Sequence, residues 1–274
     1  MRIFREPAEL QEWTRTRRLE GATIALVPTM GYLHEGHMSL IAAAKARGAD
    51  EIVVSVFVNP VQFGPNEDYA TYPRDEEADL VQCRAAGATA IFFPTPANMY
   101  LKRHSVYITE DDVSKGYCGA RRPGHFRGVC TVVAKLFNLA HPTFAVFGQK
   151  DYQQVQVIRR MVRDLNFDLD IVTAPIVREP SGLARSSRNT YLSAEEKERA
   201  LALSRALASV TVGRQAAAEQ ARIWEMLEKA GLKPDYVEFA DGETLDPVKE
   251  TAPGTVVLLA AYCGKTRLID NRVL

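Results

Sequence analysis

The chain has 274 residues, of which 46% are hydrophobic and 25% are charged, enough to bury one large core or two smaller ones without disulfides. Its 34 Lys and Arg residues balance its 34 Asp and Glu residues, so no global field attracts nucleic acid or an acidic membrane surface. No signal-peptide core opens the chain, and its longest apolar run, 256–263, is too short to span a bilayer. We therefore expect a cytoplasmic protein with no membrane or nucleic-acid partner.

Apolar strand candidates alternate with helical stretches through the first two-thirds of the chain. The strand candidates are residues 22–27, 51–58, 88–93, 143–147 and 169–173, and the helical candidates are residues 36–47, 75–86, 126–139 and 152–165. Apolar strands joined by helical crossovers predict a parallel sheet covered on both faces, with ligands at the carboxyl ends of the strands. No Gly-x-Gly-x-x-Gly follows the first strand, which disfavours dinucleotide binding of the dehydrogenase kind.

The pattern changes after Val177. A turn-rich segment leads to a capping box, Ser193 to Glu196, that predicts a helix running toward residue 210. A second helix is predicted over 216–230, and strand candidates follow at 236–239 and 256–261. We predict an α/β fold with a Rossmann-like parallel-sheet domain over residues 1–177 and a smaller C-terminal α+β lid domain over residues 178–274.

The most informative motif lies where the first strand gives way to a helix. Within residues 27–40 it places His34 and His37 three positions apart, beside Gly31 and Gly36. Free N–H groups and the helix dipole favour anions at such a turn, and imidazoles can donate hydrogen bonds to a phosphoryl group as its charge grows. The alternatives are a metal site, for which the scattered histidines and cysteines offer no patterned third ligand, and a solvated helix start.

Two further strand ends carry polar groups. Asn59 and Gln62 follow the second strand, and their neutral amides suit a hydroxyl or carboxylate substrate, although such a segment alone is more often a turn. After the fourth strand, Gly148 permits close backbone approach and Lys150 can meet a phosphate. Asp151 can cap the next helix or accept hydrogen bonds from ribose hydroxyls.

Two loop segments have both an ordinary and a functional interpretation. Residues 185–189 supply two cations, two hydroxyls and an amide, which suits either a polar linker or a mobile loop that closes on a triphosphate. Arg127 lies at a loop-to-helix turn within residues 124–128, where a surface role and a phosphate contact are both open.

Together these segments resemble the pantothenate synthetase (pantoate–β-alanine ligase) family, part of the nucleotidyltransferase superfamily of the class I aminoacyl-tRNA synthetases. The matching motifs span nearly the whole chain in the order of that family, at residues 28–37, 58–63, 72–74, 124–128, 148–154, 186–189 and 265–270. The resemblance implies a ligase that uses ATP and Mg²⁺ to condense pantoate with β-alanine to pantothenate, through a pantoyl adenylate, with release of AMP and pyrophosphate. It also implies a homodimer.

The resemblance further implies the site residues. His37, His34, Lys150 and Arg188 would be catalytic, because they stabilise charge on the transferring phosphates. The residues that would contact ATP are Met30, Gly31, His34, His37, Gly148, Gln149, Lys150, Asp151, Val177, Arg185, Ser186, Ser187 and Arg188. Gln62 and Gln154 would hold pantoate, and Gln62 would also border the β-alanine path. Asp79 is a candidate Mg²⁺ ligand, with a solvated helix face as the alternative.

Two departures from the family pattern are Arg185, where many members have Met, and Gln149, where Glu is common. Position 185 is therefore expected to act through its backbone. One alternative function is another adenylyltransferase of the superfamily with a phosphorylated acceptor, whose site should be cationic, unlike Gln62 and Gln154. A second alternative is a non-catalytic nucleotide-binding or RNA-associated relative, which the balanced charge disfavours.

Overall fold

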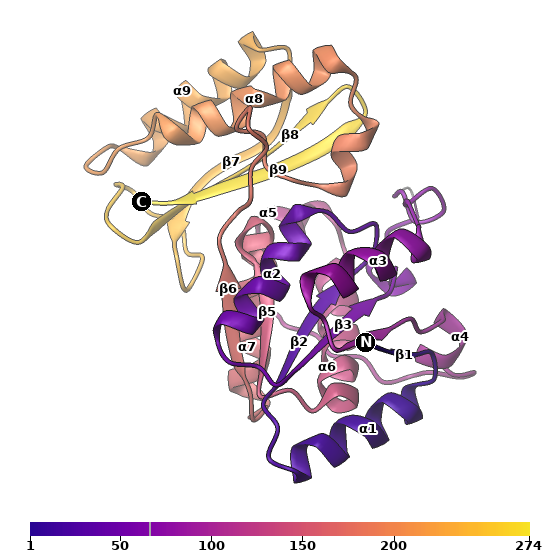
Figure 1. The fold of residues 1–274 in the computed structure, drawn as a ribbon. Coiled ribbons are helices and arrows are strands. Elements are labelled where there is room, and N and C mark those ends of the chain that lie inside the picture. Colours follow the sequence, from indigo (N-terminus) through magenta and orange to yellow (C-terminus); the bar gives the residue numbers. More distant parts are fainter. Residues whose placement is uncertain (66) are drawn as a thin grey trace. The chain divides into compact units, whose positions relative to one another are not determined.

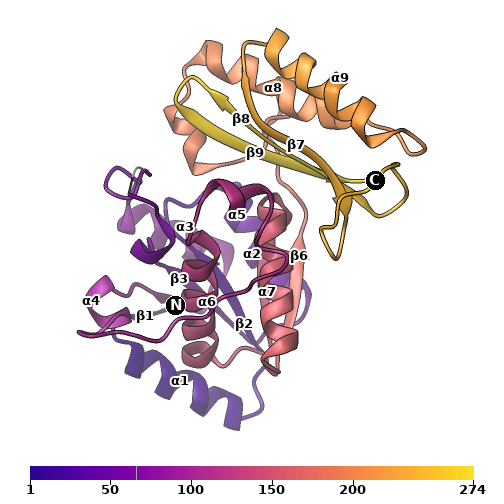
Figure 2. The same ribbon diagram turned by 180° about the vertical axis from the view of Figure 1, so that it is seen from behind.

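The computed structural model describes residues 1–65 and 67–274, which form two compact units (Figure 1, Figure 2). Unit 1 holds residues 1–148 and 157–174, and unit 2 holds residues 149–156 and 175–274. The functional boundary expected after residue 177 stays a prediction. Within the described ranges, no helix combines the length and the apolar character that a membrane crossing requires.

Unit 1 is built on a parallel sheet with six described strands in the order β1-β4-β3-β2-β5-β6. The strands are β1 (Arg2–Phe4), β2 (Ile24–Thr29), β3 (Glu51–Val56), β4 (Ala90–Phe92), β5 (Phe144–Gly148) and β6 (Asp170–Ala174). The central strands are apolar and buried, as expected for a parallel sheet covered on both faces. The predicted Rossmann-like sheet is thus confirmed.

Helices cover both faces of this sheet, as the opposite views of Figures 1 and 2 show. The α-helices of this part of the chain are α1 (Pro7–Leu19), α2 (Glu35–Ala46), α3 (Glu76–Ala86), α4 (Pro96–Met99), α5 (Tyr117–Arg121), α6 (His125–Ala140) and α7 (Tyr152–Asp164), whose first turn belongs to unit 2. On one face, Ile41 of α2 and Cys83 of α3 join Val27 and Val54 of the sheet in a common core. Helices α1 and α6 pack on the opposite face.

Unit 2 carries an antiparallel sheet covered by two helices (Figure 1). Its elements are α8 (Ala194–Ala208), α9 (Ala216–Lys229), β7 (Lys233–Asp241), β8 (Thr255–Cys263) and β9 (Thr266–Val273). Leu207 of α8 and Leu227 of α9 pack on Val257 and Leu259 of β8. This arrangement confirms the smaller α+β part of the predicted fold, whereas β9 was not predicted as a strand.

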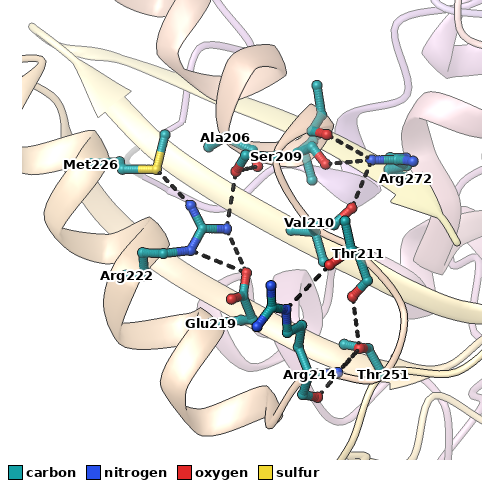
Figure 3. A network of polar contacts seen from close by, with 12 residues as sticks. Ala206, Ser209, Val210, Thr211, Arg214, Glu219, Arg222, Met226, Thr251 and Arg272 are labelled. Atoms are coloured by element: carbon teal, nitrogen blue, oxygen red, sulfur yellow. Dashed lines mark hydrogen bonds and ion pairs between the residues drawn. The ribbon is translucent and has the colours of Figure 1, made fainter.

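Arginine side chains tie the end of α8 to neighbouring elements of unit 2 (Figure 3). Arg272 of β9 donates from Nη1 to the carbonyl oxygens of Leu207, Ala208 and Val210 at 2.9, 3.1 and 3.1 Å. The last carbonyls of a helix have no hydrogen-bond donors within the helix and carry partial negative charge. A guanidinium there supplies both donors and positive charge. Arg222 of α9 donates to the Ser209 hydroxyl at 3.0 Å just beyond the same helix end. These contacts fix where α8 stops.

Candidate active site

The centre of the unit 1 sheet is a topological switch point. Strands β2 and β5 are neighbours, and the chain continues from β2 toward β3 and β4 on one side and from β5 toward β6 on the other. Ligands of open parallel sheets bind outside the carboxyl ends of the strands at such a point. Residues 30–37 follow β2, residues 57–64 follow β3, and Gly148 ends β5. The structure therefore gathers three of the predicted segments at one edge of unit 1.

His34 and His37 cap the start of α2 reciprocally. His34 Nδ1 accepts a hydrogen bond from the Gly36 N–H at 3.1 Å, and His37 Nδ1 accepts one from the His34 N–H at 3.2 Å. Their ring centroids lie 4.1 Å apart. Because Nδ1 accepts in both rings, the hydrogen of each neutral imidazole resides on Nε2. Each ring can therefore donate to an anion at the amino end of α2, where the helix dipole also favours negative charge.

A buried carboxylate holds the loop that precedes α2. Asp79 of α3 is 1% exposed, and its oxygens accept the N–H groups of Tyr32 at 3.0 Å and Leu33 at 2.7 Å. Burial raises the pKa of the Asp79 carboxyl, although these two N–H donors act in the opposite direction. Asp79 therefore has a structural role in this loop, and its role as a Mg²⁺ ligand stays a prediction.

Gly31 allows this loop to pass close to the sheet and to α3. Its φ is +83°, in the left-handed region that favours glycine. A Cβ atom at this position would lie 2.8 Å from Val56 Cγ1 and 3.0 Å from Asp79 Oδ2. A side chain here would displace the loop that the sequence assigned to the phosphates.

Gln62 connects the segment after β3 to the segment after β2. It ends the short 3₁₀ helix η1 (Pro60–Gln62) and is 8% exposed. Its Oε1 accepts from Asn59 Nδ2 at 3.0 Å, and its Nε2 lies 3.1 Å from Met30 Sδ. Asn59 Oδ1 in turn accepts the Tyr100 hydroxyl at 2.7 Å. Gln62, predicted to bind pantoate, thus contacts Met30, predicted to bind ATP. Tyr100, which sequence reasoning missed, orients the Asn59 amide that donates to Gln62.

In residues 124–128, the histidine rather than the arginine contacts the segment that carries Gln62. Arg127 stacks on Tyr107 with its guanidinium carbon 3.8 Å from the ring centroid, which favours its surface interpretation. His125 is 8% exposed, and its Nδ1 lies 2.9 Å from the Gln62 carbonyl oxygen. Sequence reasoning missed His125. The available signal was Gly128, where a Cβ would come within 2.6 Å of the main chain of η1.

In unit 2, a residue of β9 fixes the turn Gln149–Asp151 (η2). Asn271 Nδ2 donates to the carbonyls of Gln149 and Lys150, both at 2.9 Å. Lys150 Nζ lies 3.7 Å from Asp151 Oδ2, and both side chains are partly exposed. Gln154, in the first turn of α7, is also partly exposed. Asn271, which is 2% exposed, has no local sequence signal because its partners are distant along the chain.

The predicted polar loop is a folded segment of unit 2. The Arg185 N–H donates to the Val177 carbonyl at 2.9 Å, and the Arg185 side chain pairs with Glu179 at 3.6 Å. The Ser186 hydroxyl accepts the Arg188 N–H at 3.3 Å and begins the 3₁₀ helix η3 (Ser187–Tyr191). These bonds place the backbone of residue 185 beside Val177, as the expectation of a shared adenine contact requires.

A partly buried ion pair anchors this segment within unit 2. Arg178 donates to both carboxylate oxygens of Asp270 at 2.7 and 2.9 Å. Asn189 Nδ2 donates to the Ala184 carbonyl at 3.0 Å, and Ser187 is 7% exposed. The bidentate geometry of Arg178 and Asp270 fixes orientation as well as distance. Sequence reasoning assigned no role to Arg178, although the motif that ends at Asp270 contains its partner.

Comparisons with known proteins point to one family. The family model described as pantoate-beta-alanine ligase matches residues 2–273. A pantothenate synthetase from Myxococcus xanthus (strain DK1622) is 54% identical over 280 residues, which covers 99% of this chain and 96% of that protein. A pantothenate synthetase crystal structure from Thermus thermophilus has a TM-score of 0.88 and 42% identity, and covers 100% of this chain and 99% of its own.

A second solved structure carries ligands. It is a pantoate-beta-alanine ligase from Francisella tularensis complexed with beta-gamma ATP and beta-alanine. Its TM-score is 0.85 at 32% identity, and the match covers 100% of this chain and 97% of that one. Sequence and structure agree over the full length of the chain, which belongs to the pantoate–β-alanine ligase family.

Proposed function

We propose that this chain uses ATP to condense pantoate with β-alanine to pantothenate, through a pantoyl adenylate, and that it releases AMP and pyrophosphate. The observation that carries this proposal is the 3.1 Å contact between Gln62 Nε2 and Met30 Sδ. An amide suited to a hydroxy acid here touches the loop suited to phosphates. The reaction of the family and the ATP and β-alanine bound in the relative from Francisella tularensis support the same assignment.

The first assigned role is nucleotide binding at the carboxyl edge of unit 1. Met30, Gly31 and Gly148 bring backbone close to the ligand, and His34 and His37 donate from Nε2 to the phosphates. This assignment is supported by the Nδ1 atoms of both histidines, which accept main-chain N–H groups and leave the hydrogen on Nε2. Donors aimed at developing charge are the most effective electrostatic catalysts.

The second assigned role is nucleotide binding by residues of unit 2. Lys150 and Arg188 neutralise phosphate charge, and Ser186 and Ser187 help to close the loop. Asp151, with Gly148, takes the ribose, and Gln149 belongs to the same ATP-binding set. Val177 and Arg185 contact adenine through backbone groups. This part is supported by the Arg185 N–H bond to the Val177 carbonyl, which holds these two backbone positions together.

The third assigned role is acid and amine binding by neutral amides. Gln62 and Gln154 hold pantoate, and Gln62 also borders the path of β-alanine. A neutral amide can bind both a hydroxyl and a carboxylate oxygen without adding a charge to the pocket. The hydrogen bond from Asn59 to Gln62 Oε1 supports this assignment, because it turns the amide NH₂ of Gln62 toward Met30.

Mg²⁺ is part of the proposed function, as an ion held mainly by the phosphates of ATP. Within the described residues, no group of three or more His, Cys, Asp or Glu side chains is arranged to hold a metal. Mg²⁺ commonly keeps several waters and binds through substrate phosphates with one or two carboxylates, so Asp79 is the one protein ligand proposed. When bound, the ion would neutralise phosphate charge.

The proposed chemistry needs no protein nucleophile. In the first step a pantoate carboxylate oxygen attacks the α-phosphorus of ATP, and pyrophosphate leaves. In the second step the β-alanine amine attacks the acyl carbon, AMP leaves, and the amine loses a proton. Alignment and charge stabilisation dominate both steps, which is why cations and helix-start donors suffice. We also propose a homodimer, which rests on the family resemblance, and a cytoplasmic location, which rests on the composition of the chain.

An isotope-exchange assay tests the proposal. With ATP and pantoate alone, the enzyme should exchange labelled pyrophosphate into ATP, and adding β-alanine should produce AMP and pantothenate in equal amounts. Exchange that required β-alanine would exclude a free-standing pantoyl adenylate. Absence of AMP with all three substrates would overturn the proposed function altogether.

A further inference from the structure

A closed chain of polar contacts clamps the main chain that carries Gln62. Arg122 donates to both oxygens of Glu67, from Nε at 2.6 Å and from Nη2 at 2.8 Å. The same arginine lies 3.0 Å, through Nη1, from His125 Nε2, and His125 Nδ1 lies 2.9 Å from the Gln62 carbonyl oxygen. Glu67 Oε2 accepts the Gly64 N–H at 3.1 Å. Both ends of the chain of contacts therefore return to residues 62–64.

The partners of His125 determine its tautomer. Arginine has no acceptor atoms, so the His125 Nε2 facing Arg122 must accept. A carbonyl oxygen cannot donate, so the His125 Nδ1 facing Gln62 must carry the hydrogen. A neutral ring with its hydrogen on Nδ1 satisfies both contacts, and the arginine selects this form. The Arg122–Glu67 pair thus sets the direction of the hydrogen bond that His125 donates.

The packing around His125 leaves little freedom for this geometry. His125 is 8% exposed at the first position of α6, directly after Gly124, whose φ is +82°. A Cβ at Gly128, one turn later, would lie 2.6 Å from Gln62 Cα. The start of α6 is therefore pressed against the main chain of Gln62, while the side chain of Gln62 points to Met30. Movement at the carbonyl would redirect the side chain on the same residue.

We propose that His125 is a positioning residue for the acid substrate: its Nδ1–H fixes the Gln62 carbonyl and thereby aims the Gln62 amide at the pantoate. The inference rests on the proposed function, because Gln62 is assigned to pantoate there. A role in folding alone would affect every ligand equally. A positioning role should instead affect pantoate more than ATP, since His125 acts through Gln62.

Two substitutions separate these roles. In His125→Asn the amide nitrogen can occupy the place of Nδ1 and still donate to the Gln62 carbonyl. In His125→Gln the side-chain oxygen can take the place of Nε2 and accept from Arg122, but the Gln62 carbonyl loses its donor. We expect His125→Gln to raise the pantoate KM about tenfold, because a buried acceptor is left unpaired. The ATP KM should change less than about twofold, and His125→Asn should restore the pantoate KM to within about threefold of wild type. His141→Asn, at the other end of α6, is the matched control: its φ is +42°, which Asn tolerates.

Several outcomes would overturn the inference. They are a folded His125→Gln enzyme with a wild-type pantoate KM, equal increases in the KM for pantoate and for ATP, and His125→Asn no better than His125→Gln. If His125→Gln does not fold, Arg122→Lys provides the second test, because it breaks the bidentate pair at a partly exposed position and should also raise the pantoate KM selectively. Gln62→Ala separates this inference from the function itself. If Gln62→Ala raises the pantoate KM and His125→Gln does not, only the inference fails, whereas a wild-type enzyme that forms no AMP from pantoate refutes the function.

Discussion

His34 and His37 each use the ring nitrogen Nδ1 within the protein, while Nε2 is the atom assigned to the proposed nucleotide. Their Nδ1 atoms accept main-chain N–H groups at the start of α2, so part of their contribution is to the helix itself. Their Nε2–H groups are the donors assigned to the phosphates. Because different atoms serve the two roles, substitutions can remove one role and keep the other.

His37→Asn should retain the cap and lose the catalytic donor. The Asn side-chain oxygen can occupy the place of His37 Nδ1 and accept the His34 N–H, but nothing replaces Nε2–H. We expect pantoate-dependent pyrophosphate exchange to slow roughly 100–1000-fold, with ATP affinity and melting temperature close to wild type. His37→Gln should instead keep a donor near the place of Nε2 and lose the cap. Its exchange rate should exceed that of His37→Asn, and its unfolding free energy should fall by about 1 kcal/mol. Near wild-type exchange by a folded His37→Asn enzyme would remove His37 from the catalytic residues.

Asp79→Asn should loosen the loop before α2. The two oxygens of Asp79 accept two main-chain N–H groups, and an amide keeps only one acceptor, so its NH₂ would face the Tyr32 or the Leu33 N–H. We expect a loss of about 1–3 kcal/mol in unfolding free energy and exchange slowed about tenfold. Asp75→Asn is the control on the same helix, because Asn caps as well as Asp.

The same variant tests the metal role of Asp79. If Asp79 only holds the loop, the Mg²⁺ concentration for half-maximal activity should stay the same in Asp79→Asn. A large increase in that concentration, with the loop and the melting temperature intact, would favour a Mg²⁺ ligand instead. Activity and stability equal to those of Asp75→Asn would contradict both roles.

At the scale of elements, an ion pair joins the end of α5 to the loop beyond η1. Burial alone would raise the pKa of Glu67, but the hydrogen bonds and charge of Arg122, together with the Gly64 N–H, lower that pKa from 4.5 to about 2. The folded state thus binds this proton less readily than the unfolded state. The stabilisation is fully present above about pH 4.5 and is lost as the pH falls toward 2.

Glu67→Gln should therefore be destabilising in a pH-dependent way. At pH 7 we expect a loss on the order of 1–3 kcal/mol, measured by denaturant unfolding, because the Glu67 side chain is 26% exposed and only partly screened. The difference from wild type should narrow as the pH is lowered below 4.5. Glu12→Gln on the exposed side of α1 should change stability by less than about 0.5 kcal/mol. A Glu67→Gln difference independent of pH would mean that the pair contributes no linked proton.

Most helices and strands followed from apolar periodicity, and the exceptions have physical reasons. Strand β1 has three residues, too few to show alternation, and α1 follows it at Pro7 with a largely polar sequence. Strand β9, which was not predicted, contains Asp270, Asn271 and Arg272, and these polar residues interrupt an apolar strand pattern. Each of these has a distant partner: the Arg178 side chain, the carbonyls of η2, and the end of α8 (Figure 3). Such partners cannot be read from local pattern.

The candidate site divides in the same way. The residues assigned to the proposed ligands belong to motifs, so the sequence indicated His34, His37, Gln62 and Lys150. Residues that position them, such as His125, act through contacts between segments far apart in the chain. His125 lies 63 positions from the carbonyl it binds. The sequence alone could show that the glycines around His125 permit another segment to pack closely. It could not show that this segment carries Gln62.

At the scale of the whole molecule, the chain forms two units with separate cores. The core of unit 2 includes residues of α8, α9 and β8, and the core described for unit 1 includes residues of α2, α3 and its sheet. The two sets share no residue. The sequence predicted this order of a parallel-sheet part and a smaller α+β part. It did not predict that residues 149–156, the turn η2 and the start of α7, belong to unit 2, because their attachment depends on Asn271.

Separate cores predict that damage to one unit stays local. Leu227 of α9 is fully buried in the unit 2 core, so Leu227→Ala should cost about 2–5 kcal/mol of local stability through lost burial and a cavity. By hydrogen exchange, amides of α8, α9 and β7–β9 should exchange faster in this variant while those of β2 and β3 keep wild-type protection. Ile41→Ala, equally buried in unit 1, is the matched control and should give the reverse pattern. If either variant accelerated amide exchange equally in both units, the two units would unfold as one cooperative structure. Their separate cores would then not give them independent stabilities.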